Sequence, residues 1–235
     1  MPSDKLPERS SRSDIDAFLK KAASLPVTKP AGQTGRLIFA MDATASREPT
    51  WDRACHLQAE MFAETAALGG LEVQLCYYRG LREFKASGWL TDTRSLQRQM
   101  AAVRCLGGYT QIGRVLAHAT AVAKEQRTDA LVFVGDCIEE NIDEICHLAG
   151  VLGLHGVPAF MFHEGGDARA GQAFRQIAKL TKGAYCRFDA GSAHQLRDLL
   201  SAVAVYAAGG RLALERLGQR RGETVRRLSR QIDKD

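Results

Sequence analysis

The sequence predicts an α/β fold: a doubly wound, mainly parallel six-stranded sheet with one antiparallel edge strand. Apolar strand-like runs alternate with helical segments of about ten or more residues, which is typical of a parallel sheet covered on both faces. Arg79-Gly80 can form a tight turn between two such runs, and this predicts a hairpin that adds the antiparallel edge. Right-handed crossovers then favour the strand order 3-2-1-4-5-6.

The first half of the chain begins with a short predicted helix. Ser13 is a good cap, and apolar residues follow it at helical spacing. A linker with two prolines and two glycines spans 26–35 and leads into the first strand. The Gly69-Gly70 pair is a stop signal for the second helix. The predicted elements of this half are a helix over 13–22, a strand over 36–41, a helix over 49–68, and strands over 71–78 and 82–89.

The second half continues the alternation. Gly156 and Pro158 mark the entry to a strand, and Gly183 and Gly209-Gly210 mark helix ends. The predicted elements are helices over 92–103 and 112–127, a strand over 130–135, a helix over 141–154, a strand over 157–163, a helix over 168–181, a strand over 184–188 and a helix over 192–208.

Composition divides the chain into three parts. Residues 1–34 form an N-terminal helix and linker, 35–208 the α/β domain, and 209–235 a basic helical tail. Hydrophobic residues make up 45% of the chain and charged residues 25%, as in ordinary globular proteins. No apolar run approaches the roughly 20 residues that span a bilayer, and the first residues lack the apolar core of a signal peptide. The six cysteines are scattered, which favours free thiols in a reducing cytoplasm.

The basic character of the protein belongs mostly to the tail. From 211 to the end there are eight basic and four acidic residues, so this segment carries +4 of the net charge of +5. A solvated helix accounts for this composition, and contact with nucleic acid or an acidic partner is the alternative. No aromatic residue lies among the tail's arginines, so stacking on single-stranded nucleic acid is not supported, and a nucleic-acid partner is not expected.

Oxygen-bearing side chains follow two strands that the predicted order places side by side. Asp42, Thr44 and Ser46 follow the strand over 36–41, and Asp136 follows the strand over 130–135. Their carboxyl ends flank the topological switch point, where open α/β sheets bind ligands. Thr110 follows Gly107-Gly108 at the start of a predicted helix. These five hard oxygen donors are the ligand type that Mg²⁺ or Mn²⁺ prefers.

These residues resemble the metal-ion-dependent adhesion site (MIDAS) of the von Willebrand factor A (VWA) domain family, which reads Asp-x-Ser-x-Ser, then Thr, then Asp. The resemblance spans about 35–208 and is closest to stand-alone bacterial modules. Thr44 replaces a serine, and Gly135-Asp136-Cys137 stands where relatives often have Thr-Asp-Gly. The resemblance implies a Rossmann-like VWA fold and a non-catalytic module that captures a carboxylate of a partner protein through the ion.

The family's pattern also implies a role for each of the five residues. Thr44 and Ser46 would coordinate the ion directly, and Asp42 and Asp136 would act largely through water. Thr110, on its glycine-led loop, would coordinate directly only when the partner's acid is present. Hydroxyl ligands leave the ion poorly neutralised, so it keeps affinity for one more anionic group.

Other interpretations remain open. Any one of the five residues could be a helix cap or a strand-end turn. A metal-dependent phosphoryl-transfer enzyme could use Asp42 as nucleophile, but the haloacid dehalogenase type needs a second carboxylate at position 44, which is Thr44. Phosphate-loop, dinucleotide-binding and zinc-protease motifs are absent from the sequence. The segment from His163 to Asp167 could line the rim of the site, although a surface loop is favoured.

Overall fold

The computed structural model describes residues 34–48, 70–188, 197–210, 213–214 and 216–217. The predicted helices over 13–22 and 49–68 and nearly all of the basic tail lie outside the described residues, and the division into three parts stays a prediction. Among the described residues no helix is both long and apolar enough to cross a bilayer.

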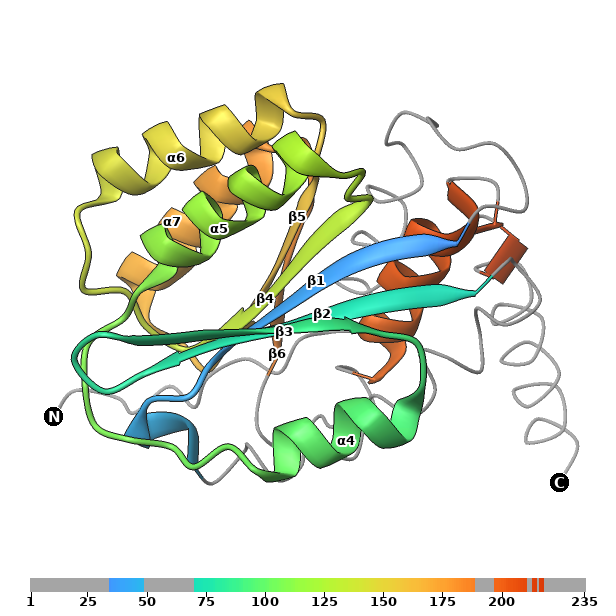
Figure 1. Cartoon of the computed structure of the whole chain (residues 1–235). Coiled ribbons are helices and arrows are strands. Elements are labelled where there is room, and N and C mark those ends of the chain that lie inside the picture. The colour runs from blue at the N-terminus through green and yellow to red at the C-terminus, as the bar shows by residue number, and fades with distance from the viewer. Residues whose placement is uncertain (1–33, 49–69, 189–196, 211–212, 215, 218–235) are drawn as a thin grey trace, which may run out of the picture.

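The described residues build a six-stranded sheet in the order β3-β2-β1-β4-β5-β6, which confirms the predicted order (Figure 1). The strands are β1 (Gly35–Asp42), β2 (Leu71–Arg79), β3 (Glu83–Leu90), β4 (Ala130–Gly135), β5 (Ala159–Glu164) and β6 (Ala184–Phe188). Only the β2–β3 pair among them is antiparallel. β1 pairs with β4 from Leu37–Ala130 to Met41–Val134, so both strands end at the same edge of the sheet.

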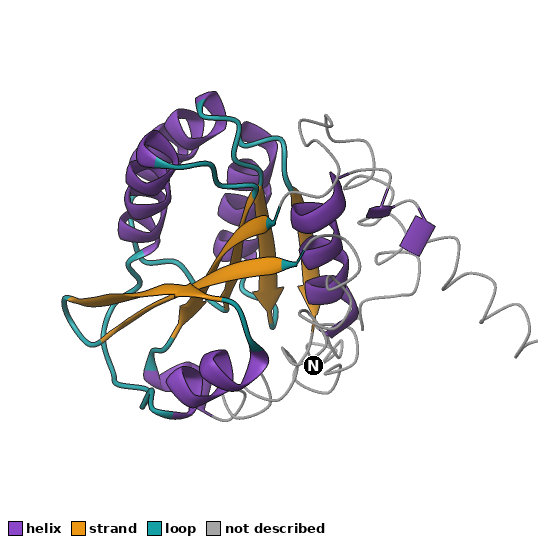
Figure 2. Cartoon of the chain, turned by 45° about the vertical axis from the view of Figure 1, so that its right-hand side comes forward, coloured by secondary structure: helices purple, strands orange, loops and turns teal. Residues whose placement is uncertain are grey.

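Helices cover both faces of this sheet (Figure 2). The helices α5 (Ile112–Glu125), α6 (Ile142–Leu154) and α7 (Ala168–Leu180) pack in one core cluster. The helix α4 (Thr93–Ala101) and the helical residues 197–210 pack in the other. Residues of β1 alternate between the two clusters, so both faces of the central strand are buried, as its apolar run predicts.

Side-chain caps fix several helix starts. Asp92 accepts a hydrogen bond from the Ser95 N–H, Asn141 from the Asp143 N–H, and Asp167 from the Ala170 N–H. These caps explain why the predicted starts fall within one residue of the observed ones. The last helix is predicted to end at Gly209-Gly210, and the described helical residues 197–210 extend to this pair. Gly210 has φ of +69°, the conformation in which glycine commonly ends a helix.

Candidate functional site

Asp42 and Asp136 lie together at the carboxyl edge of the sheet, as the topology predicts. Asp42 is the last residue of β1, and Asp136 follows the last residue of the adjacent strand β4. Potential ligand atoms of Asp42, Asp136 and Cys137 all lie within 4.8 Å of one another. The strand order alone therefore brings two carboxylates together from positions far apart in the sequence.

The Asp42 carboxylate is buried and held from both sides. Its Oδ1 accepts a hydrogen bond of 2.7 Å from the Thr44 N–H, and its Oδ2 accepts one of 2.9 Å from the Tyr78 hydroxyl. Burial raises the pKa of Asp42 above its usual range, the hydrogen bonds lower it, and the nearby charge of Asp136 raises it. Two fixed donors give this carboxylate one orientation, which suits it to hold an ordered shell of water around a cation.

A short turn after β1 brings the side-chain hydroxyls of Thr44 and Ser46 next to each other. Both belong to the turn around the 3-10 helix η1 (Ala45–Arg47), which follows β1 (Figure 1). The Arg47 N–H donates to the Thr44 carbonyl at 3.0 Å and closes this turn. The two side-chain oxygens lie 3.1 Å apart, so they can face one ion as a pair.

One carboxylate oxygen of Asp136 is able to accept a further interaction. Its Oδ1 is buried and has no hydrogen-bond partner among the described residues. An unsatisfied buried oxygen carries a desolvation cost, so each such atom in a native protein calls for an explanation. A cation beside it would supply one. The adjacent Cys137 is a poor candidate ligand for a hard cation, since burial raises the pKa of its thiol to about 12.

Thr110 is tied to the loop that follows β4. Its N–H donates to Glu139 Oε2 at 2.8 Å, and its hydroxyl accepts from the Glu139 N–H at 2.9 Å. Glu140 in turn accepts from the Ile112 N–H at 2.6 Å and the Gly113 N–H at 2.8 Å. Two acids in the Asp136 loop therefore hold the start of α5, with their charge at the favourable end of the helix dipole.

The role of Glu139 and Glu140 was missed by sequence reasoning. A pair of acids close behind Asp136 was the available signal, but only the fold shows that it faces the loop of Thr110. Thr110 is buried and engaged by reciprocal hydrogen bonds in this structure. Any movement of Thr110 toward an ion must therefore exchange its bonds with Glu139.

The end of β5 adds two buried side chains to this edge. His163 and Glu164 belong to the strand and are 1% and 7% exposed, so the favoured surface-loop interpretation is wrong for them. His163 Nε2 lies 3.3 Å from the Asp136 carbonyl oxygen, and its Nδ1 lies 2.9 Å from the Tyr185 hydroxyl. These contacts fit the alternative, in which this segment lines the rim of the site.

Glu164 forms an ion pair with Arg47, a contact that the sequence did not reveal. Arg47 directly follows Ser46, and its side chain is only 1% exposed. Burial lowers the pKa of its guanidinium, and the charges of Asp136 and then Asp42 oppose that shift. Arg47 is therefore a buried, permanently charged group that pairs with Glu164 and interacts with the charges of Asp136 and Asp42.

Exposed apolar side chains border the same edge. Leu81, Leu106 and Tyr109 are 70%, 46% and 62% exposed. The Leu106 carbonyl accepts from the Gly80 N–H at 3.3 Å, so the hairpin turn and the loop before α5 touch. The Leu106 N–H donates at 3.1 Å to the carbonyl of Ala43, which lies between Asp42 and Thr44 in the chain. These apolar residues thus sit on segments that adjoin the candidate site.

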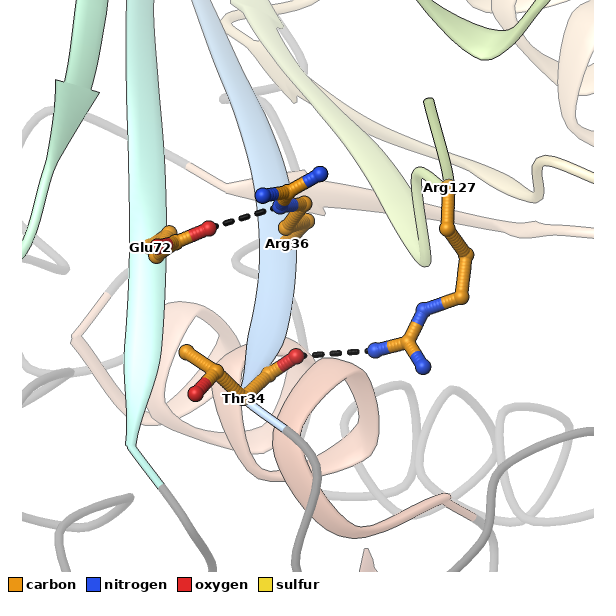
Figure 3. Close-up of a pocket in the computed structure, with 4 residues that line it drawn as sticks. All are labelled: Thr34, Arg36, Glu72 and Arg127. Atoms are coloured by element: carbon orange, nitrogen blue, oxygen red, sulfur yellow. Dashed lines mark hydrogen bonds and ion pairs between the residues drawn. The ribbon is translucent and has the colours of Figure 1, made fainter. Parts of the chain in front are cut away.

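An open hollow of about 400 Å³ lies at the opposite end of β1. Figure 3 shows its lining residues, Thr34, Arg36, Glu72 and Arg127. Arg36 Nε lies 2.6 Å from Glu72 Oε2, and Arg127 donates to the Thr34 carbonyl at 2.8 Å. Its charged groups are engaged with protein partners, and it does not extend the site at Asp42.

Comparison with known proteins supports the fold. No protein-family model and no curated protein matches the sequence. The SpRpn10 VWA domain matches with a TM-score of 0.57 at 14% identity, over 75% of this chain and 97% of that chain. The vWF domain of the type V pili tip protein Mfa5 from Porphyromonas gingivalis matches with a TM-score of 0.57 at 10% identity, over 76% of this chain and 97% of that chain. The pilus adhesin SpaC from Lactobacillus rhamnosus GG matches with a TM-score of 0.57 at 11% identity, over 77% of this chain but only 30% of that chain. At these identities the likeness is one of fold: this chain is folded like a VWA domain.

Proposed function

We propose that this protein is a metal-dependent, non-catalytic protein-binding module that captures a carboxylate of a partner protein. Thr44, Ser46 and Thr110 would hold Mg²⁺ or Mn²⁺, with Asp42 and Asp136 acting through water. The observation that carries the proposal is the meeting of the two strand-end carboxylates beside the paired hydroxyls. The bound ion would supply an electrophilic centre for an incoming carboxylate.

The donor set supports a hard cation. Hydroxyl and carboxylate oxygens suit magnesium or manganese, whereas the neutral Cys137 thiol adds no zinc site. The Asp136 oxygen without a hydrogen-bond partner is the atom that a hydrated cation would satisfy. The hydrogen bonds on Asp42 would keep its carboxylate oriented whether or not the ion is present.

The surroundings favour a protein as the partner. Leu81, Leu106 and Tyr109 offer exposed apolar area on segments that adjoin the site, and such residues are common at protein interfaces. Two solved structures with this fold are a pilus adhesin and the vWF domain of a pili tip protein. A cytoplasmic location is part of the proposal and rests on the scattered spacing of the six cysteines in the sequence, which is not that of a disulfide framework.

The metal site is tested by thermal unfolding in Mg²⁺ and in chelator. A ligand that binds only the folded state adds about 2.7 kcal/mol at 100 times its dissociation constant. We expect Mg²⁺ or Mn²⁺ to raise the melting temperature of the wild type but not of Asp42→Ala or Ser46→Ala. Cys137→Ser is the matched control and should respond like the wild type. An equal rise in Asp42→Ala would refute the site.

Partner capture is tested with the intact protein as bait, in Mg²⁺ and in chelator. We expect Thr110→Ala to lose more partner binding than metal binding, because its hydroxyl would reach the ion only in the complex. Asp42→Ala should lose both. Undiminished capture by metal-loaded Thr110→Ala would make Thr110 a structural residue held by Glu139.

The alternative at the same site is phosphoryl transfer with Asp42 as nucleophile. Position 44 is a threonine that cannot act as the general acid or base, so we expect no turnover of a generic phosphomonoester. Metal-dependent turnover by the pure protein that disappears in Asp42→Asn would establish an enzyme and overturn the binding module.

A further inference from the structure

We propose that Arg47 is an internal counter-cation of the candidate metal site and sets its affinity for divalent ions. The inference rests on the proposed function, because it assumes that a cation binds between Asp42 and Asp136. It adds two side chains, Arg47 and Glu164, that oppose each other in their effect on metal binding.

The position of Arg47 is the first observation. η1 follows β1 directly, so Arg47 is tied to the turn that presents the hydroxyls of Thr44 and Ser46. Its side chain is 1% exposed, and it forms an ion pair with Glu164, which is also buried. A buried guanidinium cannot lose its proton and must be compensated by nearby negative charge.

The surrounding charges are the second observation. Beyond its ion pair with Glu164, Arg47 also interacts with the charges of Asp136 and Asp42. Together with Glu164, they leave a cluster of three carboxylates and one guanidinium, with a net charge of −2 when all are ionised. Arg47 thus already neutralises part of the negative charge that would attract a divalent cation. It does so in a buried position, where solvent screens the charges little.

The sign of each substitution follows from this charge count. Arg47→Met removes the competing cation, leaves the cluster at −3, and should tighten divalent binding by about tenfold or more. Glu164→Gln leaves Arg47 uncompensated, lowers the cluster to −1, and should weaken binding by a similar factor. The double variant returns the cluster to −2 and should bind about as tightly as the wild type.

A purely structural role predicts a different result. If Arg47 only fastens η1 to β5, its loss destabilises the fold without tightening metal binding. If Glu164 is itself a metal ligand, the double variant binds more weakly than the wild type, because the ligand stays missing. The order of metal affinities among the wild type, the two single variants and the double variant therefore distinguishes three cases: Arg47 as a competing cation, Arg47 as a purely structural residue, and Glu164 as a metal ligand.

The test is a calorimetric titration of Mn²⁺ into the full chain of the wild type, Arg47→Met, Glu164→Gln and the double variant. Arg36→Met is the matched control, because Arg36 also pairs with a glutamate, Glu72, but at the other end of β1. Circular dichroism of each variant verifies folding. The expected order is Arg47→Met tightest, wild type and double variant equal, and Glu164→Gln weakest, with Arg36→Met unchanged.

Each outcome decides the inference. If the wild type binds and Arg47→Met binds equally or more weakly, Arg47 is not a competing cation, while the proposed metal-dependent function stands. If none of the proteins binds Mn²⁺, both the inference and the proposed function fail. If Arg47→Met does not fold, the double variant is compared with Glu164→Gln, since the two differ only at Arg47. About tenfold tighter binding by the double variant supports the proposal, and equal binding refutes it.

Discussion

The hydrogen bond from Tyr78 to Asp42 gives a direct measure of how firmly the candidate site is pre-organised. Tyr78 is fully buried on β2, and its hydroxyl donates to Asp42 Oδ2 at 2.9 Å. Tyr78→Phe removes only that hydroxyl and leaves the ring in place against Phe133, whose centroid lies 6.3 Å away. The substitution therefore isolates one hydrogen bond to a buried carboxylate.

The expected loss follows from the chemistry of that bond. A hydrogen bond to a charged group contributes roughly 1.5–3 kcal/mol, so we expect the free energy of unfolding to fall by about 2 kcal/mol. For a chain of this size, each kcal/mol corresponds to about 2–4 °C, and the melting temperature should fall by about 4–8 °C. The assay is urea unfolding of the metal-free protein in chelator, followed by circular dichroism.

A neighbouring tyrosine supplies the control for this experiment. Tyr77→Phe also removes a hydroxyl from β2, but Tyr77 is half-buried and lies across from Lys85 on the edge strand. We expect its free energy of unfolding to change by less than about 0.5 kcal/mol. A loss in Tyr78→Phe no larger than that of Tyr77→Phe would refute the pre-organised carboxylate.

Three further outcomes follow from contacts near the site. Gly108→Ala should cost about 2–3 kcal/mol in urea unfolding, because the added methyl group meets the Gly80 carbonyl, whereas Gly107→Ala, with open space around it, should be neutral within about 0.5 kcal/mol. Glu140→Gln should cost about 1 kcal/mol by weakening two hydrogen bonds at the start of α5; an unchanged midpoint would mean that solvent satisfies those N–H groups equally well. Burial lowers the pKa of His118 below 6.5, so the unfolded chain binds more protons between its folded pKa and 6.5. Stability should therefore fall as pH drops through that range, and His118→Gln should make unfolding midpoints depend less on pH; an identical pH profile would show that His118 does not contribute.

Local patterns were sufficient for the strands and for the meeting of the two aspartates. β4 and β6 have the predicted bounds, 130–135 and 184–188: β4 is an apolar run, β6 alternates buried apolar residues with half-buried ones, and glycine or a charged residue bounds each. The handedness of crossover connections then fixes β1 beside β4, so the proximity of Asp42 and Asp136 follows from topology without any knowledge of side-chain contacts. The predicted Mg²⁺ ligation by Asp42, Thr44, Ser46, Thr110 and Asp136 stays a prediction.

Only the tertiary structure decided what surrounds those residues. Arg47 and Glu164 are charged, and charged residues are mostly exposed in proteins. These two are buried because each compensates the other's charge across a separation of more than a hundred positions. Glu139 likewise reaches back to Thr110 through the packing of the β4 loop on α5. Periodicity and turn signals report which local conformation a segment prefers. These local signals contain no information on which distant charged residue will pair with a given side chain. That pairing decides whether a charged side chain can be buried at the site.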